Sequence, residues 1–163
     1  MKKNIIQAFT LMLLVSIIAC KPEPVYVLEP FGNSAEGLNG AWKLLKVTQT
    51  DEIVKLAVKP ELDITQFLTG GGEVTMKFDK TNMSYQNTGS AKVNYLGNNG
   101  TFRFDNPSTP SQLILTEPNG QVYTLIMSAP IRPEYPNNNL ILKYTRILRG
   151  KKAVSYNYIF KRQ

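Results

Sequence analysis

The stretch Leu38-Asn39-Gly40-Ala41-Trp42-Lys43-Leu44-Leu45-Lys46-Val47-Thr48-Gln49 decides the fold, because it places the only Trp of the chain at the head of its first good strand pattern. A Trp ring buries a large apolar area and can anchor a core. Gly40, two residues earlier, lets the chain enter a strand at an angle that other residues resist. The alternation breaks at Leu44-Leu45, which predicts either a β-bulge or a strand covered on both faces.

The composition favours a single β-rich domain. The chain has 163 residues, an ordinary size for one domain, and 42% of them are apolar, which is enough for a core. Eight Tyr, seven Phe, 11 Gly and 10 Pro are typical of β-structure with many turns. The expected strands cover 40–49, 73–79, 82–86, 91–96, 101–105, 112–116, 121–128, 140–148 and 153–161.

One segment has a helical rather than a strand-like pattern. Residues 60–68 carry Pro and acidic residues at the front, followed by an apolar stripe at roughly helical spacing. The stripe consists of Leu62, Ile64, Phe67 and Leu68. We expect one or two helical turns here, ended by Gly70-Gly71-Gly72. Such a segment either closes one end of a barrel or is a loop whose apolar side chains contact the core.

Turn signals separate the expected strands at short intervals. The strongest are Asn98-Asn99-Gly100, Glu117-Pro118-Asn119-Gly120 and the basic run 149–152, while the three Pro of 129–138 rule out a central strand there. Short connections favour an antiparallel meander, and a twisted sheet of about eight or nine strands with one apolar face closes on itself. The sequence therefore predicts an all-β fold, an antiparallel up-and-down barrel of about eight strands with one short helical segment.

The N-terminal segment has the pattern of an export signal. A basic start, Met1-Lys2-Lys3, precedes an apolar run over 5–19 that is too short for a stable membrane span. The run ends in Ile17-Ile18-Ala19-Cys20, which resembles the bacterial lipobox. That resemblance implies cleavage after Ala19 and lipid attachment at Cys20, whose acyl chains then anchor the protein. The alternative is a buried Cys20 beside an ordinary signal peptide.

These signals divide the chain into three parts. Residues 1–19 are the expected lipoprotein signal peptide, 20–37 a flexible tether with several Pro and Gly, and 38–163 the barrel domain. Lys21 follows the Cys, and resemblance to other lipoproteins then implies a place in the cell envelope at the outer membrane. The sequence does not indicate on which face of that membrane the protein lies.

The residue types exclude much catalytic chemistry. Without His there is no Ser-His-Asp or Cys-His system and no His-ligated metal, and a single Cys gives neither an intrachain disulfide nor a CxxC metal site. We therefore expect a non-enzymatic protein with no cofactor and no metal. Catalysis by carboxylates alone is the third-ranked alternative. Its available acids, at strand ends and turns, are Asp51, Glu52, Asp63, Asp79, Asp105 and Glu117.

The start of the barrel domain resembles the lipocalins. Their first strand carries Gly-x-Trp, as Leu38-x-Gly40-x-Trp42-Lys43-Leu44 does, followed here by Val47-Thr48-Gln49-x-Asp51. The closer resemblance is to a lipocalin-like domain family of unknown function in Bacteroidetes-type lipoproteins. In that family a lipobox precedes such a strand, a segment like 62–67 follows, and a hairpin like 140–144 with 153–158 ends the domain. The resemblance covers residues 38–162 and implies a lipocalin-like barrel.

Large rings on the inward face of the expected strands are the candidate ligand contacts. They are Trp42, Phe78, Tyr85, Phe102, Phe104, Tyr156 and Tyr158. Such rings either fill a small barrel or line a cavity. The favoured interpretation is a membrane-anchored protein that binds a small apolar or amphipathic molecule, with the loop 129–138 at the mouth. The alternative is a filled barrel that serves as an interaction subunit of an outer-membrane or cell-surface assembly.

Positive charge gathers in the last part of a chain whose net charge is +7, since no acid follows Glu134. The basic residues there are Lys143, Arg146, Arg149, Lys151, Lys152, Lys161 and Arg162. Such a surface fits anionic lipid headgroups, acidic glycans or an acidic partner, or it is a solvated hairpin. The expected partners are the membrane through the lipid on Cys20, a small hydrophobic ligand and an envelope protein, and no nucleic acid.

Overall fold

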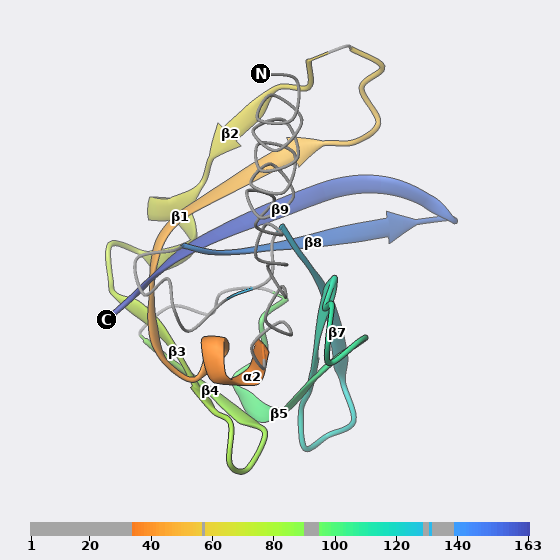
Figure 1. The fold of residues 1–163 in the computed structure, drawn as a ribbon. Helices are drawn as coiled ribbons and strands as arrows, with labels where there is room; N and C mark the ends of the chain where they lie inside the picture. The colour runs from red at the N-terminus through yellow and green to blue at the C-terminus, as the bar shows by residue number, and fades with distance from the viewer. Residues whose placement is uncertain (1–33, 57, 90–94, 129–130, 132–138) are drawn as a thin grey trace, which may run out of the picture. The chain divides into compact units, whose positions relative to one another are not determined.

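The computed structural model describes residues 34–56, 58–89, 95–128, 131 and 139–163, and they form a closed antiparallel β-barrel (Figure 1). Its elements are α2 (Ser34–Leu38), β1 (Gly40–Asp51), β2 (Glu61–Asp63), α3 (Thr65–Thr69), β3 (Val74–Asp79), β4 (Ser84–Gly89), β5 (Asn99–Phe104), β6 (Gln112–Thr116), β7 (Val122–Met127), β8 (Leu140–Leu148) and β9 (Lys151–Arg162). This confirms the predicted all-β lipocalin-like fold, with two short helices in the described part instead of one.

The barrel closes at β1, which pairs with β3 on one side and with β9 on the other. The sheet order is β2-β1-β3-β4-β5-β6-β7-β8-β9, so β1 and β3 to β9 form the eight-stranded barrel and β2 adds to the far part of β1. Trp42 marks the seam, because its register partners are Met76 on β3 and Arg162 on β9. Closure leaves the barrel strands without the unpaired edges of an open sheet.

A β-bulge at Leu45 marks the point beyond which one edge of β1 pairs with β2 instead of β3, while the other edge stays paired with β9. The register with β9 passes from Leu44↔Phe160 to Lys46↔Ile159, so Leu45 is the extra residue. Leu44 is 7% exposed and Leu45 46%, which confirms the bulge predicted from the adjacent leucines. Beyond the bulge, the edge of β1 that faced β3 pairs with β2 instead, through residues 48–50 and 61–63.

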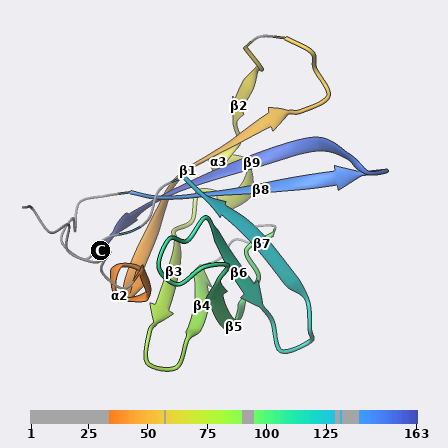
Figure 2. The ribbon, with the colours of Figure 1, turned by 45° about the vertical axis from the view of Figure 1, so that its right-hand side comes forward.

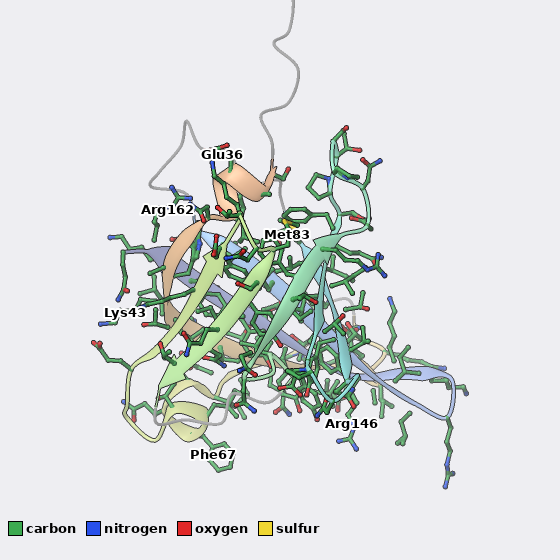
Figure 3. All side chains as sticks on the ribbon, turned by 90° about the horizontal axis from the view of Figure 1, so that it is seen from below. Glu36, Lys43, Phe67, Met83, Arg146 and Arg162 are labelled. Atoms are coloured by element: carbon green, nitrogen blue, oxygen red, sulfur yellow. The ribbon has the colours of Figure 1, made fainter. Side chains whose placement is uncertain are left out.

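The two ends of the barrel are built differently, as Figure 2 shows in outline. The helix end carries α2, the β3–β4 turn at 80–83 and the end of β9, whereas the hairpin end carries α3, the β6–β7 turn at 117–121 and the β8–β9 turn at 149–150. Figure 3 shows Glu36, Met83 and Arg162 on one side, with Phe67 and Arg146 on the opposite side.

Trp42 forms the floor of the core at the helix end. Its side chain is 1% exposed, and its indole Nε1 donates a hydrogen bond to the Leu38 carbonyl oxygen at 2.7 Å. The Arg162 guanidinium lies over the ring, 4.9 Å from the centroid, and also donates to the carbonyl oxygens of Gly37 and Asn39. One ring therefore joins α2, β1 and β9.

The helix predicted over 60–68 is wrong in its first part. Glu61–Asp63 forms β2, because β1 beyond the bulge offers a free edge to which it pairs. The helix starts only at Thr65, where Asp63 accepts hydrogen bonds from the Thr65 amide at 2.9 Å and hydroxyl at 2.6 Å. Its end at Gly70 is confirmed, since Gly70 has φ 58° and its amide donates to Gln66 O at 2.8 Å.

The predicted apolar stripe of that segment divides in two. Ile64 and Leu68 pack against the core, whereas Leu62 and Phe67 are 63% and 88% exposed. The division follows from the strand-to-helix change at residue 64, because a single helical period does not extend across it.

The predicted turn Asn98-Asn99-Gly100 is also wrong, because β5 already starts at Asn99. Gly100 instead lets β5 and β6 approach closely, because a Cβ there would lie 2.0 Å from the Thr116 carbonyl oxygen on β6. The turn lies earlier, where Tyr95 and Gly97 have φ of 69° and 65°. Of the strand expected over 91–96, residues 91–94 lie outside the described part of the chain.

The folded body begins before residue 38. Residues 34–37, which the sequence assigns to the tether, form most of α2, and Ala35 is 8% exposed. The expected signal peptide, Cys20 and the rest of the tether lie outside the described residues, as does the loop 129–138 except Ile131, which is 4% exposed. Within the described residues, no helix is long and apolar enough to span a membrane.

A largely buried carboxylate ties the segment after β1 to the outer faces of β8 and β9. The Glu52 side chain is 9% exposed and forms an ion pair with Lys59. Its Oε1 accepts from Ser155 Oγ at 2.6 Å and from Lys143 Nζ at 3.2 Å. Hydrogen bonds from Lys59 and Ser155, and then from Lys143, lower the pKa of Glu52 to about 2.

Replacing Trp42 tests the importance of the seam. We expect Trp42→Ala to lower the free energy of unfolding by about 3 to 5 kcal/mol, measured by urea titration, because it opens a cavity where β1, β9 and α2 meet. Phe67→Ala is the matched control, since that ring is 88% exposed, and should change stability by less than about 0.5 kcal/mol. Similar losses in the two variants would contradict a core anchored on Trp42.

Replacing Glu52 gives a pH-dependent result. Its folded pKa of about 2 lies below the ordinary 4.5, so ionised Glu52 stabilises the fold above that ordinary value, and the contribution is lost as the pH falls toward 2. We expect Glu52→Gln to cost about 1 to 3 kcal/mol at neutral pH and to flatten the acid-side decline of stability. Exposed Glu61→Gln is the control, and an unchanged acid profile in Glu52→Gln would refute the role of this network.

Candidate functional site

Four rings from β3, β4 and β5 pack against one another inside the barrel. The Phe78 ring makes an edge contact with Phe102, with centroids 5.4 Å apart at 88°, and lies 6.4 Å from Tyr85. Phe104 extends the group, 6.0 Å from Phe102. Phe78, Tyr85 and Phe102 are each 3% exposed, and Phe104 is half-buried. These rings fill their part of the interior by mutual contact.

A second aromatic group lies toward the hairpin end and consists of tyrosines. Tyr144 and Tyr156 are direct cross-strand partners on β8 and β9. Tyr95 stacks on Tyr144 with centroids 4.3 Å apart and planes 10° apart, and lies 5.3 Å from Tyr156. All three side chains are half-buried, unlike Tyr158, one layer deeper on β9, which is 0% exposed. We call Tyr95, Tyr144 and Tyr156 the tyrosine rim.

The hydroxyl of Tyr85 is one of two unsatisfied buried side-chain atoms among the described residues, the other being Arg162 Nε at the helix end. The Tyr85 hydroxyl is buried and has no hydrogen-bond partner among the described residues. A Cβ on Gly97 would lie 2.4 Å from that oxygen, 3.0 Å from Glu117 Oε1 and 3.1 Å from the Tyr123 ring, so these groups surround one point. Burial, with the nearby Glu117 charge, raises the pKa of Tyr85 above its ordinary value, so the hydroxyl stays protonated and can donate.

The structure divides the sequence-predicted ligand residues among three places. Trp42 lies at the floor of the helix end, and Phe78, Tyr85, Phe102 and Phe104 form the packed group. Only Tyr156 belongs to the tyrosine rim, with Tyr158 below it.

Two members of the tyrosine rim were missing from the predicted ligand set, and one of them had a signal in the sequence. Tyr144 continues the alternation of Leu140 and Leu142 on β8, which are 1% and 0% exposed, so it shares their inward face. Tyr95 comes from a turn with φ 69°, where alternation carries no information about direction.

Most of the carboxylates at strand ends accept a backbone hydrogen bond within their own turn, whereas Glu117 accepts one from a connection 19 residues away. These bonds run to Asp51 from Ile53 N (2.8 Å), to Asp63 from Thr65 N (2.9 Å), to Asp79 from Thr81 N (2.8 Å), to Asp105 from Ser111 N (2.9 Å) and to Glu117 from Asn98 N (2.8 Å). Among the described residues, no three His, Cys, Asp or Glu side chains gather where they could hold a metal ion.

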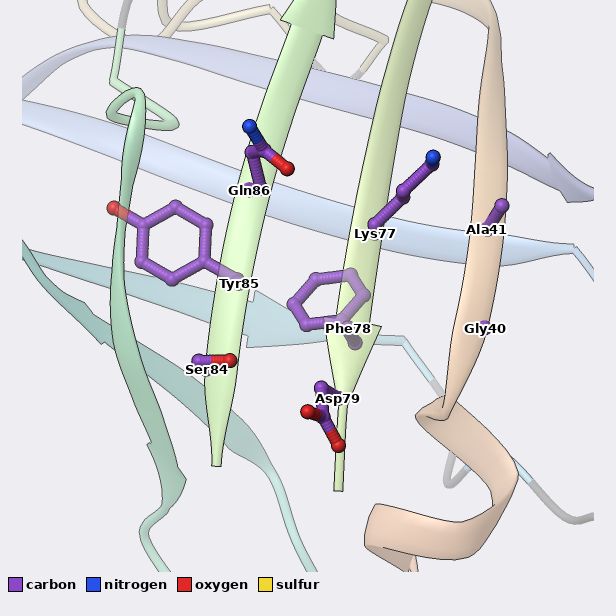
Figure 4. Close-up of a pocket in the computed structure, with 8 residues that line it drawn as sticks. All are labelled: Gly40, Ala41, Lys77, Phe78, Asp79, Ser84, Tyr85 and Gln86. Atoms are coloured by element: carbon purple, nitrogen blue, oxygen red, sulfur yellow. The ribbon is translucent and has the colours of Figure 1, made fainter. Parts of the chain in front are cut away.

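A shallow hollow of about 410 Å³ lies over β1, β3 and β4 (Figure 4). Its lining is Gly40, Ala41, Lys77, Phe78, Asp79, Ser84, Tyr85 and Gln86. The one carboxylate in it, Asp79, already accepts from Thr81 N at 2.8 Å and Asn82 Nδ2 at 2.7 Å. The hollow therefore lacks a free acid, and the half-buried tyrosine rim, which does not line it, is the second candidate site.

Comparison with known proteins adds no assignment. The sequence matches no model of a known protein family, and a search of curated proteins finds no similar sequence. The candidate site therefore depends on the geometry of this chain.

Replacing Tyr85 tests whether its buried hydroxyl lacks a hydrogen-bond partner. In the ligand-free protein we expect Tyr85→Phe to raise the free energy of unfolding by about 1 kcal/mol, because a buried unpaired hydroxyl is costly. Tyr123→Phe is the control and should not raise stability, since its hydroxyl is not among the buried side-chain atoms that lack a partner. Urea titration of both variants measures the difference. A loss of stability in Tyr85→Phe would show that the hydroxyl has a partner after all.

Proposed function

We propose that the protein is a lipid-anchored, lipocalin-like barrel that binds a small apolar or amphipathic molecule without catalysing a reaction. The observation that carries the proposal is the tyrosine rim itself: Tyr95, Tyr144 and Tyr156 are half-buried and contact one another, whereas Phe78, Tyr85 and Phe102 are each 3% exposed. Ligand sites in barrels combine apolar rings with a few convergent polar groups, as this region does.

The chemistry of the rim favours an amphipathic ligand over a purely apolar one. Tyrosine presents an apolar face and a hydroxyl at its edge. Burial is the main cause of the raised pKa of Tyr156. Its hydroxyl therefore stays protonated and can donate or accept a hydrogen bond. An aliphatic or ring portion would contact the faces of Tyr144 and Tyr156, and a polar portion would hydrogen-bond to their hydroxyls.

The anchor and the location rest on the N-terminal sequence. The lipobox-like run ending in Cys20 supports cleavage and lipidation at that residue, and Lys21 supports the outer membrane as the site of attachment. A barrel held on a membrane by a tether is well placed to take up or release amphipathic molecules at the bilayer surface.

An interaction subunit with a filled barrel is the second candidate. The packed group of Phe78, Tyr85, Phe102 and Phe104 favours it, because these rings contact one another rather than an open space. It shares the fold and the anchor with the first candidate and differs in having no interior ligand.

Native mass spectrometry of the protein purified from its own host tests the proposal. We expect a co-purifying small molecule, and about tenfold weaker retention of it in Tyr144→Ala, because losing an aromatic contact of roughly 1.4 kcal/mol changes an equilibrium tenfold. Exposed Phe67→Ala is the matched control and should retain the ligand. The intact mass of the same sample shows whether the chain begins at a lipidated Cys20. A folded protein that never carries a ligand would favour the second candidate.

A further inference from the structure

Exposed apolar side chains gather at the hairpin end of the barrel. Ile53, Leu56, Val58, Ile147 and Leu148 are each between 55% and 84% exposed. The first three belong to the segment between β1 and β2, and the last two to the tip of β8. Leu62 and Phe67, at 63% and 88% exposure, lie just beyond in β2 and α3. Large exposed apolar side chains that cluster in this way mark an interaction surface.

The two tips form one surface. Asp51, the last residue of β1, pairs with Val154 of β9, and the Glu52 amide donates to the Ala153 carbonyl at 2.9 Å. Ile53 and Leu148 then line a common hollow of about 470 Å³ with residues 149 and 151–153. In Figures 1 and 2 the β8–β9 tip projects to the right and the β1–β2 connection rises above it. We call these two tips the hairpin surface.

Unpaired positive charge surrounds these apolar side chains. Arg146, Arg149, Lys151 and Lys152 are exposed, and none forms an ion pair with a carboxylate in the described part of the chain. Of the two acids where the tips join, Glu52 does not offset these cations, because Lys59 and Lys143 already neutralise it, which leaves the single charge of exposed Asp51 against four cations. The hairpin surface is therefore both apolar and cationic.

We propose that the hairpin surface docks on an anionic phospholipid bilayer. Ile147 and Leu148, with Ile53, enter the boundary between headgroups and acyl chains, and the four cations contact lipid phosphates. Aliphatic side chains beside Lys and Arg are the pattern that binds anionic membrane surfaces, through buried apolar area and attraction to lipid charge together.

The shape of the surface favours a bilayer over an acidic protein. The apolar residues sit on a projecting hairpin and a neighbouring loop, which can enter a fluid layer without a shaped partner. The cations lie at 146, 149, 151 and 152, so all four belong to the β8–β9 tip. The inference stands apart from ligand binding, since it depends on no interior residue, and docking would turn the tyrosine rim toward the lipid.

Tryptophan quenching on vesicles tests this docking. The full chain carrying Leu148→Trp is added to phosphatidylcholine vesicles with brominated acyl chains, with or without phosphatidylglycerol. We expect the new Trp to be quenched only when phosphatidylglycerol is present, and about fivefold weaker binding for each cation removed. Wild-type chain supplies the background, because its Trp42 is 1% exposed at the opposite end.

Two matched controls make the result specific to the hairpin surface. Ile126→Trp places the same reporter at an apolar site on β7 that is 46% exposed, and it should stay unquenched however the N-terminal segment associates with lipid. Arg149→Gln with Lys151→Gln and Lys152→Gln should abolish quenching, whereas Lys77→Gln with Arg103→Gln and Lys161→Gln, exposed cations on the barrel wall, should preserve it. Equal quenching at positions 126 and 148, or none at either, would overturn the inference, whatever mass spectrometry shows about an interior ligand.

Discussion

The pairing of β1 with both β3 and β9 is the constraint on which the rest of this structure depends. Closure needs β1 to offer two edges at Trp42, and the cation–π contact with Arg162 and the indole hydrogen bond to Leu38 hold that seam from the side of the core. Once the seam is fixed, the alternation of each strand decides which side chains enter the barrel. Val74, Met76 and Phe78 on β3 are all 3% exposed or less for this reason.

The bulge at Leu45 separates the part of β1 that pairs with β3 from the part at the hairpin end that pairs with β2. It keeps Leu44 and Val47 both inward while the partner of β1 changes from β3 to β2. The space between β1 and β3 is then occupied by the segment around α3, where the Val47 amide donates to Thr65 Oγ1 at 2.8 Å and Ile64 and Leu68 reach the core. One extra residue in a strand thus accounts for a short strand and a short helix that local propensity alone would have merged.

Strand alternation predicted most of the barrel, and it failed where the chain leaves regular structure. The hairpin of β8 and β9 follows directly from the spacing of Leu140, Leu142, Tyr156 and Tyr158. Gly100 was assigned to a turn because Asn-Asn-Gly usually marks one, yet the close approach of the Thr116 carbonyl is a tertiary requirement that no local pattern shows. The tyrosine rim was found only in part, since Tyr95 reaches Tyr144 from a turn with φ 69°.

The contrast between the two ends connects stability with function. At the helix end, side chains such as Leu38, Trp42 and Phe160 are 1% exposed or less. The hairpin end carries exposed Ile147 and Leu148 beside cations that are unpaired among the described residues. Strained or unsatisfied groups occur at both ends, because Met83 has positive φ as Tyr95 and Arg149 do, and Arg162 Nε is buried without a partner among the described residues as the Tyr85 hydroxyl is. What distinguishes the hairpin end is its cluster of exposed apolar side chains, which marks an interaction surface. A tightly packed seam at one end therefore permits a cationic and apolar surface at the opposite end, which is where both the ligand and the lipid are proposed to bind.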